Sequence, residues 1–161
     1  MDKNFLTVVE VQFFRDKNNK YWIKELCILK DGFKALFVSL PPHDWDELPK
    51  KLKKVNQYSE ERLHQLLWEE GTTEFNDMEG LLKHKTRDSK YIFTKGEEKS
   101  RILSEILGRD VVDLTFETPS YQKMEARVKN CLYRNHNVNF CAYANALMCN
   151  VMRICGPEET Y

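Results

Sequence analysis

The segment 91–114 constrains the fold of this chain more than any other. Residues 91–94 (Tyr-Ile-Phe-Thr) have the β-branched and aromatic side chains typical of a strand, and 111–114 is a second short apolar run. Between them, residues 97–107 predict a helix that ends at Gly108, with apolar side chains on one face at Ile102, Leu103, Ile106 and Leu107. A strand, a helix and a strand with short links form a βαβ unit, so we expect the two strands to be parallel.

The first forty residues predict three antiparallel strands. The segments 5–14, 21–29 and 33–40 are rich in β-branched and aromatic residues, and the hairpin dipeptide Asp31-Gly32 joins the last two. Residues 139–154 predict a closing helix. Three antiparallel strands followed by parallel ones give an α/β protein with a mixed sheet of about five strands and flanking helices, in the element order of an RNase H-like fold. We expect one domain over residues 1–156 and a short tail over 157–161.

The middle of the chain predicts two helices after a basic loop. Ser59 is placed to cap a helix over 60–70, and a second helix is expected over 75–83. Four lysines follow Pro49 in a loop-like stretch: Lys50, Lys51, Lys53 and Lys54. Such a run is either a solvated surface or a contact for nucleic acid.

Composition excludes several classes of protein. Apolar residues make up 42% of the chain, which is enough for a packed core and argues against disorder. Lys and Arg total 25, as do Asp and Glu, so the formal net charge is zero and gives no support for a duplex-DNA binder. No apolar run is long enough to span a bilayer. Five irregularly spaced cysteines without a signal peptide predict reduced thiols in the cytoplasm or the nucleus.

The clearest candidate for a metal site lies near the predicted last helix. Cys131, His136 and Cys141 provide three zinc-binding side chains within eleven residues. Glu10, an acid inside an apolar strand, is a candidate for the fourth ligand, because a buried carboxylate needs a cation or hydrogen-bond partners. The alternatives are that the cysteines are core residues, and that Glu10 faces water or pairs with a Lys or an Arg.

On these residues the chain resembles the Maelstrom domain, an RNase H-like fold related to the DEDD exonucleases. Animal members of that family carry a Glu-Cys-His-Cys zinc site in place of the acidic nuclease site. Glu10 corresponds to the glutamate of that site, and Cys131, His136 and Cys141 correspond to its other ligands. The segment 91–107 (YIFTKGEEKSRILSEIL) is similar to the central strand and helix of the family. The resemblance therefore implies a structural zinc ion.

The resemblance to the Maelstrom domain also implies a degenerate nuclease site. A DEDD exonuclease uses four carboxylates to hold two divalent cations. Gln12 stands where the second acid of the first strand belongs, Lys99 replaces the third acid, and Asn145 replaces the last one. We therefore expect no conventional exonuclease activity.

The predicted function is that of a pseudo-nuclease that binds RNA. The resemblance implies binding of single-stranded RNA in the silencing of transposons by small RNAs such as piRNAs, and it allows weak RNA cleavage. Two alternatives stay open: a protein-interaction scaffold without a nucleic-acid role, which the zero net charge favours, and a metal-dependent nuclease that uses acids such as Glu10, Glu98 and Asp113. The side chains considered for RNA contact are all basic: Lys50, Lys51, Lys53, Lys54, Lys83, Lys85 and Arg87.

Overall fold

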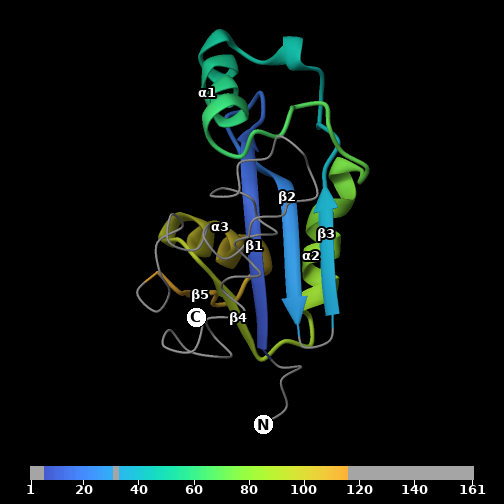
Figure 1. The fold of residues 1–161 in the computed structure, drawn as a ribbon, viewed down its shortest axis with the longest axis vertical. Coiled ribbons are helices and arrows are strands. Elements are labelled where there is room, and N and C mark those ends of the chain that lie inside the picture. The colour runs from blue at the N-terminus through green and yellow to red at the C-terminus, as the bar shows by residue number, and fades with distance from the viewer. Residues whose placement is uncertain (1–5, 31–32, 116–161) are drawn as a thin grey trace, which may run out of the picture.

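The computed structural model describes residues 6–30 and 33–115, which form a five-stranded mixed sheet with helices (Figure 1). The strands lie in the spatial order β3-β2-β1-β4-β5, with the bounds β1 (Leu6–Arg15), β2 (Tyr21–Lys30), β3 (Phe33–Val38), β4 (Tyr91–Thr94) and β5 (Val112–Asp113). β2 is antiparallel to both β1 and β3, whereas β4 is parallel to both β1 and β5. The predicted α/β class and mixed sheet are confirmed. The predicted closing helix and tail lie outside the described residues.

The alternation of side chains along β1 separates a packed face from a polar one. Val9 and Val11 lie in the main hydrophobic core, to which α2 (Met78–Thr86) and α3 (Glu97–Leu107) also contribute. Because successive residues of a strand point to opposite faces, Glu10 and Gln12 point away from this core. Both are nonetheless buried, at 0% and 6% exposure. The residues of β1 that carry chemistry therefore lie on the face that points away from this core.

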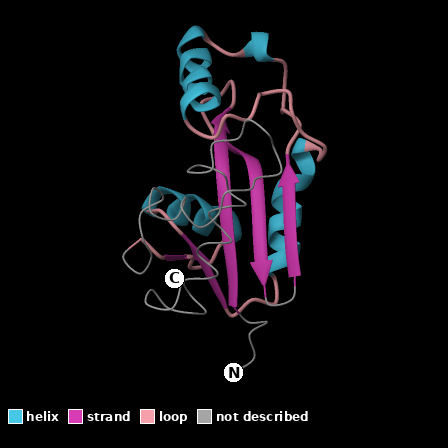
Figure 2. Cartoon of the chain, in the orientation of Figure 1, coloured by secondary structure: helices cyan, strands magenta, loops and turns pink. Residues whose placement is uncertain are grey.

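The first helix after β3 differs from the prediction. α1 spans Lys50–Arg62 (Figure 2), so the predictions of a loop over the basic run and of a helix over 60–70 are wrong. Lysine favours helices, and Pro49 has a backbone conformation that suits the residue before the first helical one. The buried side chains of α1 are spaced by about one helical turn, at Leu52, Asn56 and Ser59. The helix predicted over 75–83 is confirmed as a 3₁₀ turn followed by α2. None of the helices in the described part of the chain is both long and apolar enough to cross a membrane.

An aromatic cluster explains why the chain beyond α1 is not helical. Leu66 and Trp68 are buried, whereas Leu67 between them is 55% exposed. Such alternation belongs to an extended segment, in which neighbouring side chains point in opposite directions. The ring of Trp68 lies 5.2 Å from that of Trp22 and 5.4 Å from that of Phe14, both on the sheet. The leucines that resemble a helix face in the sequence are therefore placed by contacts with distant aromatic residues.

Lys24 on β2 fixes the segment around Trp68 to the sheet through buried hydrogen bonds. Its side chain is buried, and its ammonium donates hydrogen bonds to the backbone carbonyls of Ser39 and Trp68, each at 2.8 Å, and of Glu70. These three acceptors match the three N–H donors of an ammonium group. Burial lowers the pKa of Lys24 to about 8 because it removes water from the charged form, although Glu70 and Glu60 oppose the shift.

We expect Lys24→Met to lower the free energy of unfolding by about 3 kcal/mol, because three buried carbonyl groups lose their donor. Lys20→Met, on the exposed turn before β2, removes the same charge from the surface and should cost less than about 0.5 kcal/mol. Urea unfolding followed by tryptophan fluorescence measures both losses. Two equally small losses would contradict a structural role for the buried ammonium.

The cost of Lys24→Met should also depend on pH. In the unfolded chain the ammonium has its ordinary pKa of 10.5, so between pH 7 and pH 9 the unfolded state binds more protons than the folded one. The stability contributed by Lys24 therefore rises with pH in this interval. The loss caused by Lys24→Met should be about 1 kcal/mol larger at pH 9 than at pH 7. Urea unfolding of both chains at the two pH values tests this, and a loss that shrinks at pH 9 would refute it.

Candidate functional site

Glu10 is the centre of a buried polar cluster where β1, β4 and α3 meet. Its Oε1 atom accepts hydrogen bonds from the backbone N–H of Lys95 at 2.7 Å and from the hydroxyl of Thr94 at 3.1 Å. Its Oε2 atom lies 3.2 Å from the ammonium nitrogen of Lys99. A carboxylate removed from water is destabilised unless such partners compensate its charge. The salt bridge to a lysine, one of the alternatives open from the sequence, is thus present in the structure.

The turn before α3 places Lys99 beside Glu10. Gly96 has a φ of 126°, in the region that favours glycine, and it directly precedes the helix. The N–H of Gly96 donates to Oδ1 of Asp113 at 2.9 Å, which fixes the turn to β5. Lys99 then lies in the first turn of α3 and is 18% exposed at its side chain. The ion pair therefore depends on the strand-to-helix turn that the sequence predicts.

Cys27 is the cross-strand neighbour of Glu10 on β2 and is fully buried. Burial raises the pKa of its thiol well above the usual range, and the nearby carboxylates of Glu25 and Glu10 add to this shift. The thiol therefore stays protonated at neutral pH, as expected of a core cysteine.

The other acids considered for a nuclease site have partners of their own. Glu98 accepts a hydrogen bond from the hydroxyl of Tyr21. Asp113 accepts hydrogen bonds from the N–H of Gly96 and from both the N–H and the hydroxyl of Thr115. Burial alone would raise the pKa of Asp113, but these hydrogen bonds outweigh it and leave the pKa below its usual value. Within residues 6–30 and 33–115, no three His, Cys, Asp or Glu side chains are grouped to hold a metal ion.

The structure brings together two of the three residues that the sequence interpretation assigned to degenerate nuclease positions. Lys99 contacts Glu10 directly, and Gln12 follows Glu10 by two residues on the same face of β1. The Nε2 atom of Gln12 is buried and has no hydrogen-bond partner among the described residues. The remaining predicted positions lie outside the described residues: Cys131, His136, Cys141 and Asn145. Of the predicted zinc ligands, the structure therefore describes Glu10 alone.

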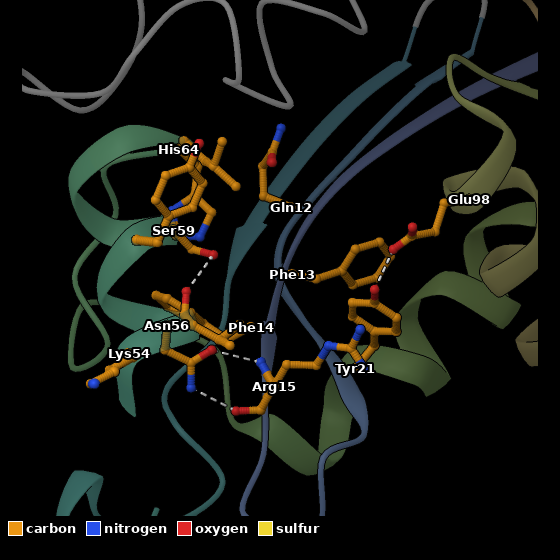
Figure 3. A pocket seen from close by; sticks show the side chains of 13 residues that line it. Gln12, Phe13, Phe14, Arg15, Tyr21, Lys54, Asn56, Ser59, His64 and Glu98 are labelled. Carbon is orange, nitrogen blue, oxygen red and sulfur yellow. Dashed lines mark hydrogen bonds between the residues drawn. The ribbon is translucent and has the colours of Figure 1, made fainter. Parts of the chain in front are cut away.

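A pocket of about 510 Å³ adjoins this cluster and lies between α1 and the ends of β1 and β2 (Figure 3). Its volume falls within the range of small-molecule sites. α1 and the segment after it supply one side, including Asn56 and His64, whereas Phe13, Tyr21 and Glu98 supply the other. Gln12 extends from β1 between the two sides. Two of the lining residues, Gln12 and Glu98, are two residues and one residue away in sequence from Glu10 and Lys99.

Two interactions hold the walls of this pocket. The side chain of Asn56 accepts a hydrogen bond from the N–H of Arg15 at 2.9 Å and donates one to its carbonyl at 2.8 Å, which fixes α1 to the end of β1. The guanidinium of Arg15 lies 3.4 Å from the centre of the Tyr21 ring, a cation–π contact. Burial and the hydrogen bond to Glu98 raise the pKa of Tyr21, so its hydroxyl stays protonated at neutral pH.

The two basic runs lie at opposite ends of the sheet (Figure 1). Lys54 on α1 lines the pocket, and Lys50 and Lys51 are exposed on the same helix. Lys53 lies 3.8 Å from a carboxylate oxygen of Asp46. The second run follows α2 to the end of the β2–β3 hairpin, where three basic side chains lie: Lys83, Lys85 and Arg87. Of the two runs, the first therefore borders the pocket through Lys54.

The sequence interpretation missed the pocket. The position of Asn56 could have indicated a buried polar contact, because it lies one helical turn from Leu52 on the buried face of a basic helix. Tyr21 and Glu98 are 77 positions apart, and no local pattern indicates that they meet.

No protein-family model matches the chain, and a search of curated proteins finds no match either. Function is therefore inferred from the geometry around Glu10 and from the adjoining pocket.

We expect Lys99→Met to lower the free energy of unfolding by about 3 kcal/mol in buffer with EDTA, because it leaves the buried carboxylate of Glu10 without its cation. Arg101→Met on the same helix breaks an exposed ion pair with Glu105 and should cost less than about 1 kcal/mol. The double variant Glu10→Gln/Lys99→Met should recover part of the loss, since no charge is then buried alone. Thermal or urea unfolding measures all three. Equal losses for Lys99→Met and Arg101→Met would exclude a buried ion pair.

Proposed function

We propose that this chain is a degenerate RNase H-like domain that binds single-stranded RNA and lacks metal-dependent exonuclease activity. The observation that carries the proposal is the ion pair of Glu10 with Lys99, at the strand-to-helix junction where an exonuclease of this fold requires acids. The resemblance to the Maelstrom domain extends the proposal to the silencing of transposons by small RNAs.

The ion pair disfavours the two-cation chemistry of an exonuclease. That chemistry needs several carboxylates around two divalent cations about 4 Å apart. Here Glu10 already has an ammonium at 3.2 Å, which would repel a divalent cation at the same carboxylate unless further anionic ligands offset the repulsion. Gln12, next on this face, is neutral and binds such cations weakly. Without further anionic ligands, one carboxylate paired with a lysine is therefore a poor site for the two cations of an exonuclease.

The charges near the pocket support binding of nucleic acid. The exposed lysines of α1 lie on the side of the pocket away from Glu98, and Arg15 and Lys17 are close to the same helix. Phosphate groups bind such clusters mainly through electrostatic attraction, even where the whole chain is neutral. Aromatic side chains interleave with these cations in the pocket, which is typical of surfaces that bind single strands.

We also propose a structural zinc ion held by Glu10, Cys131, His136 and Cys141. Carboxylate, thiolate and imidazole are the ligands that zinc takes. The carboxylate of Glu10 accepts three interactions, and a carboxylate has about four acceptor positions, so one position remains for a ligand bond. With four protein ligands the ion would have no open position and would stabilise the fold rather than take part in a reaction.

The first test concerns RNA binding. We expect single-stranded RNA to bind with an affinity that falls steeply with salt. Replacing three charges of α1, in Lys50→Gln/Lys51→Gln/Lys54→Gln, should reduce the slope of log K against log salt by about 2 and weaken binding at least tenfold. The matched control removes three charges at the other end of the sheet, in Lys83→Gln/Lys85→Gln/Arg87→Gln, and should leave the slope unchanged. Fluorescence anisotropy measures both.

The same experiment includes a test for cleavage. With Mg²⁺ or Mn²⁺ present, the labelled RNA should release no mononucleotides, because the metal-binding acids are missing. Metal-dependent release that is lost in Glu10→Ala would refute the pseudo-nuclease proposal. Failure of the parent chain to bind RNA at low salt would favour the protein-interaction scaffold instead.

The second test concerns zinc. Purified chain should contain one zinc ion per molecule, as measured by mass spectrometry, and removal of zinc should lower the unfolding temperature. Glu10→Gln and His136→Ala should each reduce the zinc content. Cys149→Ser removes a thiol outside the proposed ligand set and should leave the zinc content unchanged. Zinc-free protein with the same unfolding temperature as the zinc-loaded form would overturn this part of the proposal.

A further inference from the structure

We propose that the pocket between α1 and β1 binds one unstacked nucleobase of a single strand, with the amide of Gln12 donating a hydrogen bond to a carbonyl oxygen of that base. This inference rests on the proposed RNA binding. It assigns the place at which the protein contacts a base of the strand in addition to its phosphates. No residue of the pocket was identified as a base contact from the sequence.

The first observation is the state of Gln12. Its side chain is buried, lines the pocket and has an Nε2 donor without a hydrogen-bond partner among the described residues. A buried donor without a partner is costly, so its position in a pocket indicates that a ligand supplies the acceptor. The ring carbonyls of uracil, cytosine and guanine are acceptors of this kind.

The second observation is the ring chemistry of the pocket. Tyr58 of α1 lines the pocket and is 58% exposed, so a ligand in the pocket can reach its ring. The Tyr21 ring has Arg15 over one face and its hydroxyl bonded to Glu98, so it is held as a fixed wall. Both rings line the pocket, and aromatic rings can stack on a flat ligand such as a nucleobase.

The third observation is the distribution of charge around the pocket, which favours one path for the phosphate backbone of the strand. Lys54 lies on the α1 side of the pocket, and the exposed carboxylate of Glu98 lies on the other side. Phosphates are attracted to the first and repelled by the second. The backbone of the strand should therefore follow α1, with one base turned inward toward Gln12.

The experiment compares two decamers with equal charge: oligouridine RNA, and a chain of tetrahydrofuran phosphates that carries no bases. The parent should bind oligouridine more tightly than the base-free decamer. Gln12→Leu and Tyr58→Ala should each weaken oligouridine binding about tenfold and leave binding of the base-free decamer unchanged. Tyr91→Ala removes another exposed tyrosine, on β4 and outside the pocket, and should change neither affinity.

The possible results separate this inference from the proposed function. Binding of both decamers with equal affinity, unchanged by Gln12→Leu and Tyr58→Ala, would overturn the base pocket and leave RNA binding through phosphates intact. Binding of neither decamer at low salt would overturn the proposed function itself. The unfolding temperature of each variant is also measured, and a value within a few degrees of the parent establishes that the variant is folded. If Gln12→Leu does not fold, Tyr58→Ala still tests the proposal, because it changes an exposed side chain.

Discussion

The site depends on the hydrogen bonds and the ion pair of the Glu10 carboxylate. A negative charge buried in the middle of a sheet is tolerated only if several partners reach it, and these come from the end of β4 and from the first turn of α3. The contacts of this one carboxylate therefore fix β1, the turn at Gly96 and the start of α3 relative to one another. The same requirement places Gln12 and Glu98, the neighbours of Glu10 and Lys99, at the edge of the pocket.

The pocket depends in turn on how α1 is attached. The helix has little apolar surface, and its buried face includes Asn56, which makes two hydrogen bonds to the backbone of Arg15 rather than an apolar contact. Lys24 holds the segment after α1 through backbone carbonyls. Polar anchors of this kind fix a helix at a defined place while leaving space between it and the sheet, whereas close apolar packing would fill that space.

The sequence predicted the sheet well and the region around α1 poorly, for a physical reason. Strands β1 to β4 and helix α3 are specified by local alternation, turn residues and helical spacing, all of which are visible in a short window. The helix over Lys50–Arg62 is attached to the sheet through Asn56 and Arg15, and the extended segment around Trp68 is specified by distant partners such as Trp22 and Lys24. Glu10 was singled out because it interrupts an apolar strand, with exposure to water left open, and its pairing with Lys99 needs the βαβ geometry to be known.

Under the proposed function, the positive charge at position 99 accounts both for the absence of exonuclease chemistry and for the binding of RNA. An acidic exonuclease site repels phosphate unless divalent cations are bound, so its affinity for a nucleic acid depends on the metal. In this chain the acid at position 10 is neutralised by a lysine of the same chain, and the nearby face of β1 continues with a neutral amide. The cluster therefore presents no net negative charge to a strand that approaches along α1. Under the proposed function, such a site holds a single strand without the two cations of an exonuclease and does not cut it.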